Sequence, residues 1–481
     1  MTSRQPSILV ASNRGPLSFS TGDDGQLRAR RGGGGLVSGL SAIDPAAGAL
    51  WVCAAMSEAD RQAATAAPDG RLDLAGHDTG GQAVRMLRIP ADTFERAYNA
   101  VANSTLWFVH HLLYDLPNQP VFDEGFGRDW EAYRRYNEAF ARALAEQAGP
   151  EAKVLVQDYH LTLVPGMLRG LRPDLRIGHF SHTPWAPADY FRLLPEAVGR
   201  EILTSLLAAD NTAFHSPRWA QAFADCCTAL LDAEVKTEES AISYDGRLTR
   251  LGVHPLGADG EFLRARAAQA DVAGRMAALR ETVGDRRLIV RVDRTELSKN
   301  IVRGLLAYRD LLRTQPEWRG EVVHLAFAYP SRHDLPEYRE YTAAVQRTAR
   351  QINDEFGHGD WQPVVLEVND DFPRSLAAYR LADVVLVNPI RDGMNLVAKE
   401  APVLSDDGCA LVLSQEAGAH DELGPDALVV HPFDVSGTAR ALDAALRMDP
   451  AERRARCRRL AAAATAVPPD RWLTEQLEAL G

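Results

Sequence analysis

The sequence predicts an α/β protein built from two doubly wound domains, each with a parallel β-sheet covered by helices on both faces. A chain of 481 residues is long enough for two domains of roughly 200 to 250 residues. Short apolar, β-branched runs alternate with longer stretches of helical period, a pattern typical of parallel strands buried by crossover helices. Such runs occur in both halves of the chain: Ile8–Ala11, Val154–Gln157, Ile177–Phe180, Leu288–Val292, Val322–Phe327, Val364–Leu366, Val384–Val387 and Ala410–Leu413.

A cluster of glycine and proline residues between Leu251 and Gly260 separates the two series of strands. We therefore expect a first domain over residues 1–253 and a second over residues 254–465. Ligands of open α/β sheets bind beyond the carboxyl ends of the strands. Residues that directly follow the predicted strands are therefore expected to face a central cleft, and they are the candidates for a functional site.

The chain is acidic, with 53 Lys and Arg against 65 Asp and Glu and a net charge of −12. Nucleic acids and anionic membranes require a cationic footprint, so no nucleic acid and no membrane is expected as a partner. The five cysteines contain no C-x-x-C pair, and no apolar run is as long as a signal-peptide core or a membrane span. We expect a cytoplasmic enzyme with small-molecule substrates.

Two motifs near the N-terminus are candidate phosphate contacts. The first predicted strand ends in Ser12-Asn13-Arg14, and the glycines at 32–35 precede a helix-like stretch from Leu36 to Ile43. Glycines in front of a helix let backbone N–H groups approach a phosphate, with the positive end of the helix dipole behind them. The alternative for the glycines is a flexible turn without a ligand.

Asp158 and His182 each follow a predicted strand of the first domain. A carboxylate and an imidazole at neighbouring strand ends can both reach the cleft and orient sugar hydroxyls. The alternatives are a helix N-cap for Asp158 and a hydrogen-bonded core histidine for His182.

Arg294 and Lys299 stand five residues apart, directly after a predicted strand of the second domain. A guanidinium acts as a planar fork and an ammonium as a point charge, so together they can bind a diphosphate. The alternative is a pair of surface salt bridges with Asp293 and Glu296.

The segment from Asn388 to Glu400 follows another buried strand and leads into a helix. Gly393 and the first helical N–H groups can contact phosphate and sugar oxygens. Asp392 can accept from a sugar hydroxyl, and Glu400 can accept from a ribose. The alternative is a simple strand-to-helix turn.

At these residues the sequence resembles trehalose-6-phosphate synthases, a family of retaining glycosyltransferases with the GT-B architecture. The resemblance implies two Rossmann-like domains facing a central cleft: an acceptor-binding N-terminal domain and a nucleotide-sugar-binding C-terminal domain. A C-terminal helix at about 466–481 is expected to pack back on the first domain. The matching motifs occur in the family's order: Ser12-Asn13-Arg14, Gly34-Gly35-Leu36, Tyr98-Asn99, Leu106-Trp107, Asp158-Tyr159-His160, Ser331-Arg332 and Arg391 to Glu400.

The resemblance implies roles for the matching positions of this chain. The acceptor and its phosphate are expected to contact Arg14, Tyr98, Trp107, Asp158 and Arg332. The nucleotide diphosphate of the donor is expected to contact Gly35, Arg294, Lys299, Leu396 and Glu400. The glucose of the donor is expected to contact His182, Asp392, Gly393, Met394 and Asn395.

The implied reaction transfers glucose from a nucleotide-glucose to glucose 6-phosphate with retention of configuration. Front-face attack requires no protein nucleophile, so cations aimed at the departing diphosphate should contribute most to catalysis. We expect Arg294 and Lys299 in that role, with Asp158 and His182 orienting the two substrates. The chain contains no Asp-x-Asp motif and no Asp-x-Asp-Gly-Thr phosphatase signature. No metal or other cofactor is therefore expected, and a separate trehalose-phosphate phosphatase is expected to act downstream.

Two other functions are alternatives. One is a pseudo-glycosyltransferase that joins cyclitol units through nitrogen in antibiotic biosynthesis, and the other is a non-catalytic sugar-phosphate sensor. The resemblance is closest to the actinobacterial branch, which favours GDP-glucose over UDP-glucose as donor. Ala54 and the stretch Asn369–Phe372 depart from the common family form, so the base preference is open. A homo-oligomer is compatible with the sequence, which does not determine the oligomeric state.

Overall fold

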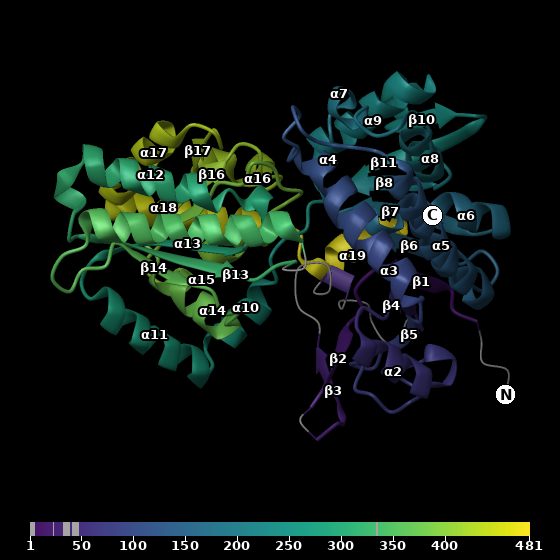
Figure 1. The fold of residues 1–481 in the computed structure, drawn as a ribbon, viewed down its shortest axis with the longest axis horizontal. Helices are drawn as coiled ribbons and strands as arrows, with labels where there is room; N and C mark the ends of the chain where they lie inside the picture. The colour runs from purple at the N-terminus through teal and green to yellow at the C-terminus, as the bar shows by residue number, and fades with distance from the viewer. Residues whose placement is uncertain (1–4, 23, 32–38, 41–47, 333–334) are drawn as a thin grey trace. The chain divides into compact units, whose positions relative to one another are not determined.

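The computed structural model describes residues 5–22, 24–31, 39–40, 48–332 and 335–481. Contacts divide the chain into two compact units, Met1–Leu256 with Pro469–Gly481, and Gly257–Pro468. Figure 1 follows the chain through both units. The division falls three residues after the expected seam at 253/254. The last helix, α19 (Pro469–Glu478), groups with the first unit.

The first unit contains a nine-stranded sheet with the order β5-β4-β1-β6-β7-β8-β11-β10-β9. Neighbouring strands from β5 to β11 run parallel, and β10 and β9 add an antiparallel edge. Strand β4 is fully buried and β6 is buried after its first residue, as their continuous apolar sequences predict. The strands are β1 (Ile8–Ser12), β4 (Leu50–Ala54), β5 (Ala83–Leu87), β6 (Lys153–Gln157), β7 (Arg176–Ser181), β8 (Asn211–Phe214), β9 (Glu234–Lys236), β10 (Ala241–Tyr244) and β11 (Arg247–Val253).

A separate hairpin and several helices complete the first unit. The hairpin pairs β2 (Leu17–Thr21) with β3 (Leu27–Arg31). A π-helix, η3 (Arg96–Leu106), lies between two short α-helices and carries Tyr98. The α-helices are α2 (Glu58–Ala66), α3 (Ala91–Glu95), α4 (Trp107–His111), α5 (Glu124–Gln147), α6 (Val164–Leu171), α7 (Ala188–Phe191), α8 (Glu196–Leu206) and α9 (Pro217–Leu231).

Helix α19 is anchored to the first unit by its tryptophan. Trp472 is completely buried, its ring lies edge-on to Phe180 with centroids 5.0 Å apart, and its Nε1 donates to the His254 carbonyl over 3.0 Å. The ammonium of Lys153 donates to the Leu477 carbonyl over 3.0 Å. The C-terminal helix thus packs behind the strands that carry Asp158 and His182.

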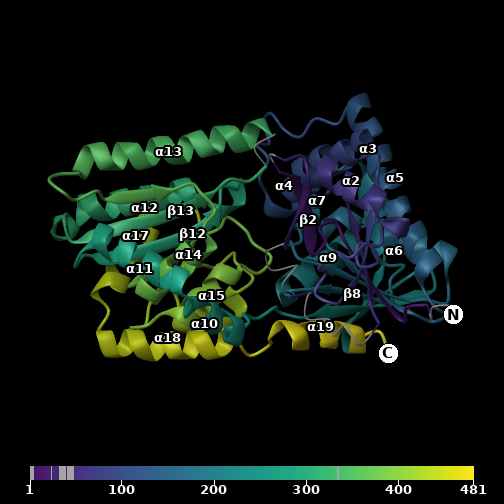
Figure 2. The ribbon, with the colours of Figure 1, turned by 90° about the horizontal axis from the view of Figure 1, so that it is seen from below.

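The second unit has a six-stranded parallel sheet with the order β14-β13-β12-β15-β16-β17. Figure 2 shows helices α12, α13 and α17 on one face of this sheet and α14, α15 and α18 on the other. The strands are β12 (Arg287–Arg294), β13 (Val322–Tyr329), β14 (Val364–Glu367), β15 (Val384–Val387), β16 (Ala410–Ser414) and β17 (Leu428–Val430). The α-helices are α10 (Gly260–Ala267), α11 (Ala270–Val283), α12 (Ile301–Thr314), α13 (Pro336–Phe356), α14 (Phe372–Leu381), α15 (Leu396–Leu404), α16 (His420–Leu423), α17 (Val435–Arg447) and α18 (Pro450–Ala464).

Both sheets reverse their strand order at one point, which places the candidate ligand positions. In the first unit the reversal lies between β1 and β6, and in the second between β12 and β15. Ligands of doubly wound sheets bind at the carboxyl ends of the strands at such a point. Among the described helices, none combines the length and apolar character needed to span a bilayer.

Candidate active site

In the first unit, Arg14 and Asp158 follow the two strands β1 and β6 at the reversal point. Buried hydrogen bonds fix the turn after β1: Trp51 Nε1 donates to Ser12 Oγ over 2.7 Å, and Ser12 Oγ donates to the Arg14 carbonyl over 2.8 Å. The Tyr136 hydroxyl donates to Asn13 Oδ1 over 2.5 Å. The Arg14 side chain is exposed at the end of this fixed turn, where it can contact an anion.

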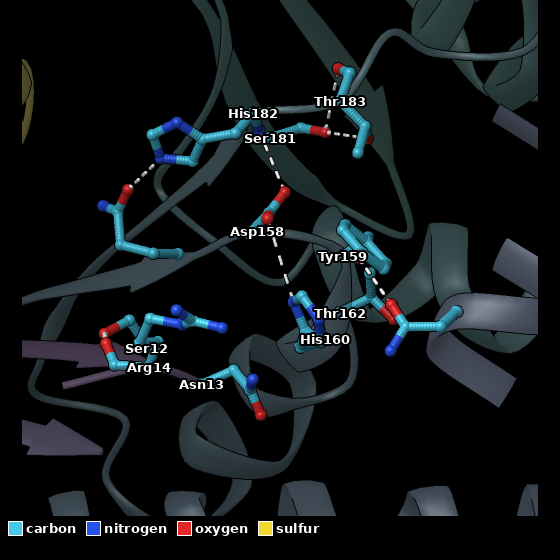
Figure 3. A network of polar contacts seen from close by, with 12 residues as sticks. Ser12, Asn13, Arg14, Asp158, Tyr159, His160, Thr162, Ser181, His182 and Thr183 are labelled. Atoms are coloured by element: carbon cyan, nitrogen blue, oxygen red, sulfur yellow. Dashed lines mark hydrogen bonds and ion pairs between the residues drawn. The ribbon is translucent and has the colours of Figure 1, made fainter. Parts of the chain in front are cut away.

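Asp158 has an unusual backbone conformation, with φ of 75° and ψ of 170°. This region is essentially restricted to glycine and costs a non-glycine residue about 1–3 kcal/mol. Its carboxylate accepts from the backbone N–H of His182 over 3.1 Å and lies 3.8 Å from Nδ1 of His160. Figure 3 shows Asp158 between these two histidines. The strained backbone thus aims a carboxylate at a polar cluster, an arrangement typical of functional sites.

The His182 ring is held by two protein groups. Its Nε2 lies 2.8 Å from Gln157 Oε1, and its Nδ1 lies 3.2 Å from Nε2 of His215. Burial, with smaller contributions from His215 and His179, lowers the pKa of His182 well below its usual value. The ring is therefore neutral at physiological pH. Its expected contact with the donor's glucose remains a prediction.

The two aromatic residues expected near the acceptor belong to one aromatic cluster. The Tyr98 ring stacks on His160 with centroids 5.6 Å apart and is partly exposed. Trp107 is only 8% exposed, stacks on His111 at 3.9 Å and contacts Tyr159 at 5.6 Å. The structure thus brings Tyr98 next to the Asp158 cluster and places Trp107 behind Tyr159.

In the second unit, Lys299 and Asp392 meet at the reversal point between β12 and β15. Lys299 Nζ donates to Asp392 Oδ2 over 2.6 Å. Burial alone would lower the pKa of Lys299, but the carboxylates of Asp392, Asp293 and Glu296 raise it above its usual value. The ammonium is therefore charged and fixed before any ligand arrives. Lys299 and Asp392, predicted separately as donor contacts, lie in direct contact.

Glu296 connects the predicted cations of the second unit. Its carboxylate is fully buried, pairs with Arg294 Nη1 at 3.1 Å and accepts from Ser331 Oγ over 2.9 Å. Burial would raise its pKa, but Arg294, Arg332 and Lys299 outweigh burial and lower it to about 2. The Arg294 side chain is nevertheless 55% exposed. Arg294 thus forms the salt bridge with Glu296 that was the alternative to a diphosphate contact, and its guanidinium is still exposed to solvent.

The segment after β15 forms the N-terminus of α15. Asn395 adopts a left-handed conformation with φ of 76° and caps the helix by accepting from the Ala398 N–H over 3.3 Å. Its Nδ2 donates to Asp392 Oδ2 over 3.1 Å. Met394 is 4% exposed, so its side chain packs in the core and only its backbone can serve a ligand. The helix starts at Leu396 and directs its first N–H groups toward the Asp392 segment.

Glu400 lies one turn into α15 and is partly exposed. Burial raises the pKa of its carboxyl to about 7. The group therefore changes charge near neutral pH, an uncommon property for a glutamate and a frequent one at functional sites.

One expected donor contact, Gly35, lies outside the described residues. Gly35 and Leu36 fall in the range 32–38, which is not described. The sequence predicted Glu296 only as an alternative, surface partner of the two cations, and its burial at the centre of the cluster was not predicted. In the described ranges, no three His, Cys, Asp or Glu side chains gather as a metal site would require, and metal independence stays a prediction.

Comparisons with known proteins match almost the entire chain. The glycosyltransferase family 20 model matches residues 6–481. A trehalose-6-phosphate synthase of Mycobacterium sp. (strain JLS) is 34% identical, covering 98% of this chain and 96% of that protein. A bifunctional trehalose-6-phosphate synthase/phosphatase of Thermoproteus tenax is 34% identical over 95% of this chain, which spans 60% of the length of that protein.

A solved structure gives the same result. The α,α-trehalose-phosphate synthase (UDP-forming) of Burkholderia xenovorans in complex with glucose-6-phosphate is 27% identical, with a TM-score of 0.85 over 98% of this chain and 99% of that one. The fold is therefore the expected GT-B type. Together with the family match, these likenesses show that this chain belongs to glycosyltransferase family 20, the family of the trehalose-6-phosphate synthases.

Proposed function

We propose that this protein is an α,α-trehalose-6-phosphate synthase, transferring glucose from a nucleotide-glucose to glucose 6-phosphate. The observation that carries the proposal is the chemistry at the two reversal points. The second unit presents Lys299, Arg294 and a helix N-terminus, which suit a diphosphate. The first presents Arg14 and Asp158, which suit a sugar phosphate. Full-length relatives of that name support the same assignment.

The proposed mechanism retains configuration by front-face attack, without a protein nucleophile. Negative charge develops on the diphosphate as the glycosidic bond breaks, and fixed cations stabilise it most effectively. Lys299 and Arg294 supply these cations, and the departing phosphate oxygen takes the proton of the acceptor hydroxyl. Asp158 and His182 orient the substrates. This reaction uses no metal or other cofactor, so activity should survive EDTA.

Release of nucleoside diphosphate tests the proposal directly. Purified protein is incubated with glucose 6-phosphate and either UDP-glucose or GDP-glucose, and both nucleoside diphosphate and disaccharide phosphate are measured. We expect both products in equal amounts, with the α,α linkage visible by NMR. No release with any nucleotide-glucose would refute the function. Release without glucose 6-phosphate dependence would indicate another acceptor.

The base of the donor is resolved by the same panel. The actinobacterial resemblance favours GDP-glucose, whereas the Burkholderia relative is named UDP-forming. We propose GDP-glucose as the better donor, and a higher kcat/KM with UDP-glucose would overturn that choice. Because the Thermoproteus relative is named a synthase/phosphatase, we also propose that a trehalose-phosphate phosphatase consumes the product.

Two alternatives give different results in this assay. A pseudo-glycosyltransferase would release nucleoside diphosphate only with a cyclitol donor and an amino-cyclitol acceptor. A sugar-phosphate sensor would bind glucose 6-phosphate and release nothing. The charged Lys299–Asp392 pair and the exposed Arg294 favour a catalytic donor site, since a sensor of the acceptor does not need them.

A further inference from the structure

Arg291 is a buried cation that the proposed reaction does not use. It lies on β12 among apolar neighbours and is 0% exposed. Burying a charge costs several kcal/mol unless the charge is well paired. Among the described residues, its Nη1 has no hydrogen-bond partner. A buried arginine between Val290 and Val292, with one nitrogen unpaired among the described residues, is costly and requires a reason.

The other nitrogens of Arg291 connect β12 to the turn that carries Lys299. Nη2 donates to the Lys299 carbonyl over 2.5 Å, and Nε donates to Asp293 Oδ2 over 2.8 Å. Lys299 ends the short helical turn η6 (Leu297–Lys299), and its own Nζ reaches Asp392. One guanidinium therefore holds the backbone of the residue whose ammonium faces the donor segment.

Asp293 would otherwise compete for the Lys299 ammonium. Burial raises the pKa of the Asp293 carboxyl above its usual value. Arg291 and Lys299 lower this pKa, and Asp392 raises it. Because Arg291 binds Asp293 directly, the Lys299 ammonium is left to pair with Asp392. Arg291 with Asp293 and Lys299 with Asp392 thus form two separate ion pairs.

Gly304, on helix α12, provides the space for Arg291. A Cβ at position 304 would lie 2.1 Å from Arg291 Nη1 and 3.2 Å from Asn388 Oδ1. Real Cβ atoms do not approach other atoms this closely, so a side chain at 304 must displace the guanidinium. The observed position of Arg291 thus requires a residue without a side chain at position 304.

From these contacts we propose that Arg291 is a positioning residue for the donor site: it fixes the Lys299 backbone and occupies Asp293, so that the ammonium faces the donor's diphosphate. The inference rests on the proposed function in that the ligand is a nucleoside diphosphate. Arg291 itself touches no substrate. Its role is to set the affinity for the donor without affecting the affinity for the acceptor.

The test compares Arg291→Met and Gly304→Ala with a matched control, Arg453→Met. Arg453 is also a buried arginine of the second unit, 7% exposed, and it pairs with Asp383 over 2.6 Å, away from the donor segment. Calorimetry measures the Kd of UDP and GDP for each full-length variant, and kinetics measure both KM values. Residues that orient metal ligands act in the same indirect way, and their loss weakens the metal site about 10- to 100-fold.

We expect Arg291→Met to raise the nucleoside diphosphate Kd about 10- to 100-fold, with the KM for glucose 6-phosphate within about twofold. Arg453→Met should lower the melting temperature and leave this Kd unchanged. Arg291→Lys, which keeps the charge, should lie between wild type and Arg291→Met. The effects of Arg291→Met and Gly304→Ala should not add, because the double variant lacks Arg291 Nη1, the atom that the new methyl group would otherwise displace.

Three results would overturn the proposal: a folded Arg291→Met or Gly304→Ala variant with wild-type Kd, equal weakening by Arg291→Met and Arg453→Met, or additive effects in the double variant. If Arg291→Met does not fold, Gly304→Ala and Arg291→Lys decide the question through the same Kd. The binding test does not require turnover. If the wild-type protein binds UDP or GDP but transfers no glucose, only the proposed function is refuted. If the wild-type protein binds neither UDP nor GDP, both the proposed function and the proposed role of Arg291 are refuted.

Discussion

Replacing Glu296 with glutamine should destabilise the protein strongly and in a pH-dependent way. The carboxylate is fully buried and contacts Arg294 and Ser331. Glutamine has the same shape and can keep a hydrogen bond to Ser331, but it has no charge. The variant therefore isolates the electrostatic contribution of one buried anion to the cation cluster.

The size of the effect follows from the lowered pKa of Glu296. A change from 4.5 to about 2 in the folded protein corresponds to about 3 kcal/mol in favour of the ionised form. Because the folded-state pKa lies below the unfolded value, this stabilisation is complete above about pH 5 and is lost as the pH falls toward 2. About 2 kcal/mol should remain at pH 3.5. For a domain the size of the second unit, about 3 kcal/mol corresponds to roughly 6 to 12 °C in melting temperature.

Scanning calorimetry of wild type and Glu296→Gln between pH 7 and pH 3.5 measures this difference. The control is Glu452→Gln, which removes an exposed pair with Arg456 and should shift the transition by less than about 4 °C, since such pairs contribute about 0–1 kcal/mol. The difference for Glu296→Gln should narrow as the pH falls. A difference that stays constant with pH, or one no larger than that of the control, would refute the electrostatic reasoning.

Three further variants test the candidate site. Asp158→Gly should leave the melting temperature unchanged or raise it, because glycine relieves a backbone strain of about 1–3 kcal/mol. The same variant should lower kcat/KM at least about 100-fold, because the carboxylate is lost. A clear loss of stability would show that the backbone of Asp158 is not strained. In Gly418→Ala the new Cβ would lie 1.9 Å from the carbonyl oxygen of Gly393, an expected donor contact, and would displace it. We expect donor binding to weaken about 10- to 100-fold. An unchanged donor KM would contradict this expectation. Donor affinity should rise between pH 6 and pH 8 as Glu400, with a pKa of about 7, ionises and accepts from the ribose. Glu400→Gln should abolish that pH dependence, and a dependence that persists in this variant must come from another group.

The parallel core of both units could be predicted from the sequence because burial on both faces leaves a direct signature. Val384–Val387, for example, is a continuous apolar run and forms β15 with the same bounds. The hairpin of β2 and β3 was not predicted, because β3 is largely exposed and arginine-rich and lacks an apolar face. The π-helix at Arg96–Leu106 differs from an α-helix by its hydrogen-bond register, which residue spacing does not reveal.

The candidate site was predictable to the extent that its residues follow strands. Arg14, Asp158, Lys299 and Asp392 all lie at the carboxyl ends of strands beside a reversal of strand order. The buried charges beneath them were not predictable as a network. Glu296 is distinguished from an exposed glutamate only by its burial and by Ser331, 35 positions away along the chain.

These buried charges explain how the second unit keeps cations in place without a ligand. Lys299 and Arg294 would repel each other if both faced the same point without a counter-charge. Asp392 Oδ2 lies 2.6 Å from Lys299 Nζ, and Glu296 Oε1 lies 3.1 Å from Arg294 Nη1. In the proposed reaction these cations need not move when negative charge develops on the diphosphate. Such preorganised charges are the main source of electrostatic catalysis. In the proposed reaction it also sets a limit, because the donor's diphosphate would compete with Asp392 for the Lys299 ammonium. Replacing Asp392 with asparagine should therefore release Lys299 toward the phosphates and tighten nucleoside diphosphate binding. The same change should slow glucose transfer, because the donor's sugar loses its expected carboxylate contact.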